Sequence, residues 1–155
     1  MMSMPAVLQM VTEAPLIRKF STADLTTHGA WIVPRMMKAF PHLNERAVAS
    51  FLQNIEYNNE FCFLFRDDSV ALAQVVQSHA LTGPSVVYER FVWCQNPEDK
   101  EQQRHAAEFY VHIRRWAKQM GIDTLIVEES SDVPHDLIKE KLGRIFSRTQ
   151  QFARL

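Results

Sequence analysis

Three apolar runs that lie close together in the sequence and are joined by short turns place the strongest limit on the fold. Phe61 to Phe65 and Val70 to Val76 flank Asp67-Asp68-Ser69, which is typical of a β-hairpin. Val86 to Cys94 follows a turn at Gly83-Pro84. Because neighbouring strands with short connections pair antiparallel, these runs predict one antiparallel sheet of at least three strands.

The hydrophobic period changes from about Asp99. Apolar residues then recur at helical spacing up to Gly121, which is a natural residue to end a helix. They are Ala106, Phe109, Tyr110, Ile113, Ala117 and Met120. Ile122 to Val127 is predicted to be a further strand. A strand–helix–strand crossover requires a parallel pair, so the sheet is expected to be mixed.

The N-terminal half predicts one short strand and a helix. Leu16 to Phe20 is the strand, and Ser21 to Asp24 offers a capping box in which the Ser21 hydroxyl and the Asp24 carboxylate accept from free amides. Gly29 and Pro34 interrupt the helix that follows, so we expect it to be bent or broken before Pro41 ends it.

The remaining elements complete the order β-α-α-β-β-β-α-β-α-β. Asn44 is predicted to cap a second helix, whose apolar residues recur at helical spacing. Pro134 to Leu142 is predicted to be a short helix that Gly143 ends, and Ile145 to Leu155 a strand or small hairpin. The fold class is therefore α/β (α+β), with a mixed, mostly antiparallel sheet flanked by helices.

Composition indicates one ordinary globular domain. The 155 residues are 46% hydrophobic, and the formal net charge of −1 gives no overall electrostatic reason to bind nucleic acid or an anionic membrane. We expect a single domain over residues 1–155, with 1–13 as an N-terminal extension that is not a signal peptide. Cys62 and Cys94 lie in apolar runs, which favours buried free thiols and a soluble, cytoplasmic protein.

Several segments, in order, resemble the GNAT superfamily of N-acetyltransferases. Leu16 to Leu25 is similar to the opening strand and helix cap of that family, and Arg115 to Val127 to its central helix and fifth strand. Lys141-Leu142-Gly143 is similar to its last helix. The resemblance implies the GNAT-like sheet. In size and in its short C-terminal end the chain is similar to reduced GNAT-like proteins of bacteriophages, including virion components.

The resemblance also places the acyl-CoA phosphate loop of the family on residues 101–106, where this chain departs from the family pattern. Glycines in that loop let the backbone approach the CoA pyrophosphate at the start of a helix. Of the candidate cofactor-binding residues Arg104, His105 and Ala106, Ala106 alone matches the pattern, and Arg104 stands in a glycine position. Glu98, Asp99 and Glu101 add negative charge beside it. The alternative is that Arg104 and Lys100 hold phosphates as side-chain cations.

The catalytic residue that the resemblance implies is Glu89, on the fourth strand, as a base that deprotonates the amine. The alternative is an outward-facing Glu in an alternating strand. At the position where the family often has a tyrosine acid, this chain has Lys139, for which a solvated helix face is the simpler interpretation.

Other patterns favour structural roles. His105 and His112 are two turns apart without a carboxylate at ligand spacing, so no metal site is predicted. Trp31, Met36-Met37 and Phe40 could form a patch for a partner or an acyl chain, with core packing as the alternative. The C-terminal segment carries the one basic cluster, which could contact nucleic acid or be a solvated edge. It consists of Lys139, Lys141, Arg144, Arg148 and Arg154.

These observations predict a GNAT-like protein that has lost acetyl-CoA catalysis and acts as a binding or structural protein, with a virion component as one such role. We expect no cofactor, no membrane, and a protein partner or self-assembly. The alternatives are an active N-acetyltransferase that uses acetyl-CoA on a small amine or a protein amino group, and a nucleic-acid-binding accessory protein.

Overall fold

The computed structural model describes residues 16–77, 85–127, 131–143, 145–147 and 151–154. Its helices are α2 (Asp24–Ala39), α3 (Glu45–Asn54), the 3₁₀ turn η1 (Ile55–Tyr57), α4 (Lys100–Gln119) and α5 (His135–Leu142). Its strands are β1 (Arg18–Lys19), β2 (Phe61–Arg66), β3 (Ser69–Gln77), β4 (Ser85–Cys94), β5 (Thr124–Val127), β6 (Ile145–Ser147) and β7 (Gln151–Arg154). The predicted N-terminal extension and the Gly83-Pro84 turn lie outside the described residues.

The strands form a single sheet in the order β1-β2-β3-β4-β5-β7-β6. The β4–β5 pair is parallel, and the other neighbouring pairs in the described chain are antiparallel. This confirms the predicted mixed, mostly antiparallel sheet. The C-terminal segment is a hairpin, and its second strand inserts between β5 and β6.

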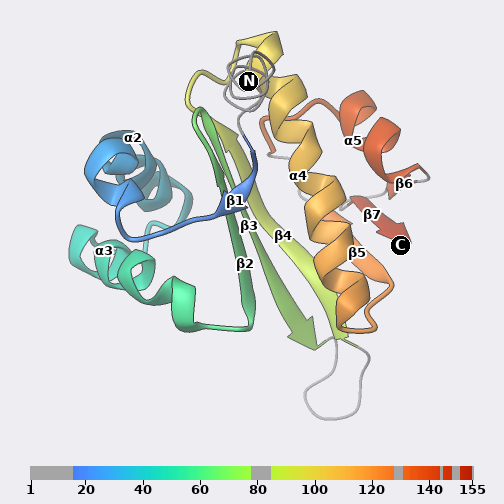
Figure 1. Ribbon diagram of the computed structural model, residues 1–155, viewed down its shortest axis with the longest axis horizontal. Coiled ribbons are helices and arrows are strands. Elements are labelled where there is room, and N and C mark those ends of the chain that lie inside the picture. The colour runs from blue at the N-terminus through green and yellow to red at the C-terminus, as the bar shows by residue number, and fades with distance from the viewer. Residues whose placement is uncertain (1–15, 78–84, 128–130, 144, 148–150, 155) are drawn as a thin grey trace, which may run out of the picture.

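Two helical layers cover the sheet (Figure 1): α2 and α3 lie over one face, and α4 and α5 over the other. Each layer has its own apolar core. On the α2–α3 face, Ile32, Met36 and Leu52 pack against sheet residues such as Phe63 and Phe91. On the other face, the buried stripe of α4 packs against β2 to β5. The alternation of side chains along the strands keeps the two cores apart.

Helix α2 is continuous through Gly29 and Pro34, so the break that was one of the two expectations is absent. Burial of Ile32 and Met36 against the sheet holds the helix together on both sides of the proline. The predicted capping box is half right. The Asp24 carboxylate accepts from the Ser21 backbone N–H at 2.8 Å, but no side chain caps the helix at its N-cap residue.

The other helix ends follow the prediction. Asn44 caps α3, with its side-chain oxygen 2.8 Å from the Ala47 amide. Gly121 and Gly143 end α4 and α5 with positive φ angles of 74° and 82°, a backbone conformation that favours glycine.

Candidate functional site

A β-bulge in β4 places the charged residues of that strand. Ala73 pairs with Glu89 and Leu72 with Phe91, so Arg90 is an extra residue between two registered pairs. As a result Glu89 faces the α4 layer, where Tyr110 of α4 contacts it, while Arg90 and Phe91 both face the α2–α3 layer. The bulge therefore sends neighbouring charged side chains to opposite faces of the sheet.

Glu89 is fully buried, with a relative exposure of 0%. Its carboxylate accepts a hydrogen bond from the hydroxyl of Tyr110, whose oxygen also lies 2.9 Å from the Ser131 hydroxyl. Burial, together with the neighbouring Glu89 charge, raises the pKa of Tyr110 well above its usual value. The alternative of an outward-facing Glu89 is therefore wrong. Sequence reasoning missed Tyr110, which it assigned only to the apolar helix face, and Ser131.

This buried pair has no route to solvent through its own side chains. Tyr110, like Glu89, is 0% exposed. A carboxylate and a phenol in hydrogen-bond contact are able to exchange a proton with each other. The catalytic role of Glu89 stays a prediction.

The first turn of α4 is capped by its own chain. The Asp99 carboxylate accepts from the amides of Glu101 and Gln102 at 2.9 and 3.3 Å. The Asp99 backbone carbonyl accepts from the Gln103 amide at 3.0 Å. Two of the amides that an anion would use at this helix start, those of Glu101 and Gln102, are thus already bonded to the Asp99 side chain.

Of the three predicted cofactor-binding residues, two line one hollow and the third is buried. Ala106 is buried in the core against the sheet. Arg104 is exposed and lines a hollow between α4 and α5 together with His105 and Glu108. His105 lies near Asp68, but its Nδ1 is 3.7 Å from the carboxylate and has no hydrogen-bond partner. The structure therefore brings Arg104 and His105 to one hollow, which Glu108 and Glu140 also line, and leaves the Ala106 side chain in the core.

Asp132 occupies the carboxyl end of β4. Its backbone amide donates to the Val92 carbonyl at 3.0 Å, and its carboxylate accepts from the Cys94 amide at 2.9 Å. Arg35 of α2 binds the same carboxylate at 2.5 Å and donates to the Cys94 carbonyl at 2.9 Å. The carboxyl ends of parallel strands commonly offer backbone groups to a ligand, and here the chain fills that place itself.

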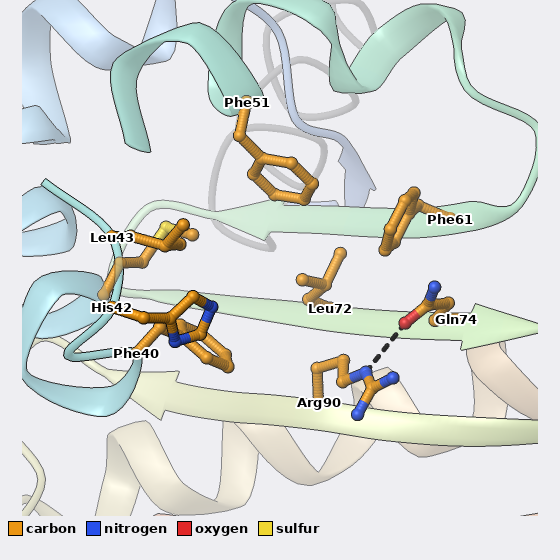
Figure 2. Close-up of a pocket in the computed structure, with 9 residues that line it drawn as sticks. Phe40, His42, Leu43, Phe51, Phe61, Leu72, Gln74 and Arg90 are labelled. Atoms are coloured by element: carbon orange, nitrogen blue, oxygen red, sulfur yellow. Dashed lines mark hydrogen bonds between the residues drawn. The ribbon is translucent and has the colours of Figure 1, made fainter. Parts of the chain in front are cut away.

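An apolar hollow of about 330 Å³ opens on the α2–α3 face. Figure 2 shows Phe40, His42 and Leu43 at one end, Arg90 with Gln74 at the other, and Leu72 between them. Met36, Phe51 and Phe61 complete the lining. Of the predicted patch of Trp31, Met36, Met37 and Phe40, Trp31 and Met37 pack against the core of the same face, and the buried Met36 and the half-buried Phe40 line this hollow. We refer to it as the α2–α3 hollow.

The other candidate groups are a possible metal site and the two cysteines. In the described part of the chain, no group of three or more His, Cys, Asp or Glu side chains could hold a metal ion. Burial raises the thiol pKa of both Cys62 and Cys94 to about 12, and the two thiols are free.

The predicted basic cluster is only partly described. The Lys141 ammonium is paired with the Glu108 carboxylate at 2.6 Å, and Lys139 is exposed. Arg154 is described through its backbone, which pairs with Thr124 across β7 and β5. Arg144 and Arg148 lie outside the described residues.

Comparison with known proteins gives no family assignment: no protein-family model matches the chain, and no curated protein matches it either. Among the described residues no helix has the length and apolar character needed to span a bilayer.

Proposed function

We propose that this chain is a GNAT-like protein that has lost acetyl-CoA catalysis and acts by binding. The resemblance of its segments to that family supports the fold assignment, together with a sheet whose parallel pair is connected by α4. A protein partner or self-assembly, for example in a bacteriophage particle, is the form of binding we propose. Lys141 is neutralised by Glu108, which makes nucleic acid a weaker candidate.

The start of α4 carries this proposal. An acyl-CoA diphosphate needs free backbone amides and positive potential at a helix N-terminus. Here the Asp99 carboxylate bonds to two of those amides and adds a negative charge to the same place. Binding a diphosphate would require breaking the cap and bringing like charges together, and both changes cost free energy.

The end of β4 supports the proposal independently. A cofactor arm lying along β4 beyond its pairing with β5 would need the Cys94 amide and the Val92 carbonyl. Asp132 already bonds both groups, and Arg35 fixes Asp132 in place. Two separate segments thus occupy the backbone positions that a bound coenzyme would use.

Calorimetric titration with acetyl-CoA tests the proposal. We expect no saturable heat from the wild-type protein. Tight binding that is lost in Arg104→Glu, but kept in Arg115→Glu on the exposed face of the same helix, would overturn it. This pair of variants separates a specific phosphate contact from a general effect of charge on α4.

The alternative function is an active N-acetyltransferase that uses acetyl-CoA. The observation in its favour is the carboxylate–phenol pair of Glu89 and Tyr110 beside the β4 bulge. If the alternative holds, Glu89→Gln slows acetyl transfer to an amine while leaving the affinity for CoA nearly unchanged. An unchanged rate would remove Glu89 from the mechanism.

A further inference from the structure

We propose that the α2–α3 hollow is a binding site for a small apolar carboxylate, whose anionic group pairs with Arg90. The inference goes beyond the proposed function and does not depend on it, since the hollow lies on the face of the sheet opposite α4. It concerns a small-molecule site rather than a protein partner. The shape of the hollow, its apolar lining and the cation of Arg90 support it.

The lining of the hollow is suited to the apolar part of a ligand. Three phenylalanine rings, Phe40, Phe51 and Phe61, surround the floor residue Leu72 (Figure 2). The volume of about 330 Å³ lies at the lower end of the roughly 300–1,000 Å³ that is usual for small-molecule pockets. A medium-length alkyl chain or a single aromatic ring matches this size.

The charge of the residues that line the hollow favours an anionic ligand. None of its nine lining residues is Asp or Glu, and Arg90 brings in a permanent positive charge. The described residues contain no ion-pair partner for Arg90: its guanidinium lies 4.6 Å from the centre of the Tyr88 ring and bonds the neutral Gln74. A charged group at an apolar surface gains most from an opposite charge that is also shielded from water.

The guanidinium is held in one orientation for such a partner. Arg90 Nε donates to the Gln74 side-chain oxygen at 2.8 Å. Gln74 in turn donates its amide to Glu60 at 2.6 Å, which fixes the oxygen toward Arg90. Guanidinium has five N–H donors, so this contact leaves several for a two-point bond to a carboxylate. The β4 bulge is what places this group in the hollow rather than on the α4 face.

Titration with matched probes tests the proposal. Octanoate, octan-1-ol and octylammonium share one apolar chain and differ in charge. By calorimetry and amide chemical-shift mapping of the full chain, we expect octanoate to bind saturably and to shift the amides around Leu43 and Leu72. Octan-1-ol should bind roughly tenfold more weakly or worse, and octylammonium not at all. 3-Phenylpropionate serves as the aromatic carboxylate.

Variants separate the two parts of the site. Arg90→Met should lower octanoate affinity roughly tenfold or more while keeping the side-chain bulk, and Arg90→Lys should retain part of it. Leu43→Trp, at a half-buried position on the rim, should block the hollow without removing the cation. Arg115→Met on the opposite layer is the control and should bind as wild type does. Far-UV circular dichroism and thermal midpoints verify that each variant folds.

Several results would overturn the proposal. One is the absence of saturable binding for both carboxylates. Another is equal affinity for octanoate and octan-1-ol, which would leave Arg90 without a role. Unchanged octanoate affinity in both Arg90→Met and Leu43→Trp would place the ligand elsewhere. A separate acetyl-CoA titration reports on the proposed function, so failure of one proposal is distinguishable from failure of the other.

Discussion

Tyr110 and Glu89 form a polar contact in the interior, between α4 and β4. A buried carboxylate is costly unless it accepts hydrogen bonds, and the tyrosine hydroxyl supplies one of them. The Ser131 hydroxyl extends the contact to the segment before α5. At the scale of single residues this pair is therefore first of all a determinant of stability.

We predict that Tyr110→Phe lowers the free energy of unfolding by about 1–3 kcal/mol, because it removes a hydrogen bond to the buried carboxylate of Glu89. The pH dependence should change as well. The pKa of Tyr110 is raised in the folded protein, so its contribution is complete below the unfolded value near 10 and is lost as pH rises above it. The variant should lack this alkaline loss.

Urea denaturation at several pH values between neutrality and pH 11 measures both effects. Tyr57→Phe is the control, because Tyr57 is 83% exposed. Equal alkaline slopes for wild type and Tyr110→Phe would contradict the prediction.

In helix α4 the cap residue Asp99 both stabilises the helix start and occupies amides that a bound anion would need. We predict that Asp99→Ala destabilises the protein by about 1 kcal/mol, since it frees the amides of Glu101 and Gln102. Asp99→Asn keeps a side-chain oxygen and should cost less. Thermal or urea unfolding gives the ranking, and a loss in Asp99→Asn as large as in Asp99→Ala would refute the capping role.

At the scale of elements the sequence predicted most of the sheet, because strands and turns depend on local patterns. It did not predict the β4 bulge. Strict alternation would put Val87, Glu89 and Phe91 on one face, and a single inserted residue, Arg90, moves Phe91 to the other. The pattern of polar and apolar residues along the strand gives no sign of the inserted residue. The α2–α3 hollow was therefore beyond sequence reasoning, although Phe40 belonged to a predicted patch.

In helix α2 the break that Pro34 could cause does not occur, because packing against the sheet overrides the local rule. Pro34 lacks an amide proton and was expected to break or bend the helix. The buried residues on either side of it pack on the sheet, and the helix continues. Similarly, Tyr110 lay in a predicted apolar stripe that is buried except for Met120, which is 40% exposed, but its contact with Glu89 depends on tertiary placement.

At the scale of the whole molecule, the two cysteines report on folding. Burial raises the pKa of both thiols to about 12, and both belong to the core beneath α4. We predict that neither reacts with a thiol reagent at pH 8 until the protein unfolds, because reaction requires both exposure and thiolate. The labelling rate should rise with denaturant in parallel with global unfolding.

Cys62→Ser and Cys94→Ser assign the two reactions, which can be followed by mass spectrometry. Rapid labelling of either thiol in the absence of denaturant would show that one end of the sheet opens separately, contrary to this prediction.

The contact of Arg35 with Asp132 has a mechanical consequence. The sheet separates two helical layers, one on each face. At the end of β4, Arg35 of α2 forms an ion pair with Asp132, which lies in the segment that leads into α5. A displacement of α2 would therefore be transmitted through this ion pair to the segment before α5. The two sides are coupled at their edge as well as through the strands between them.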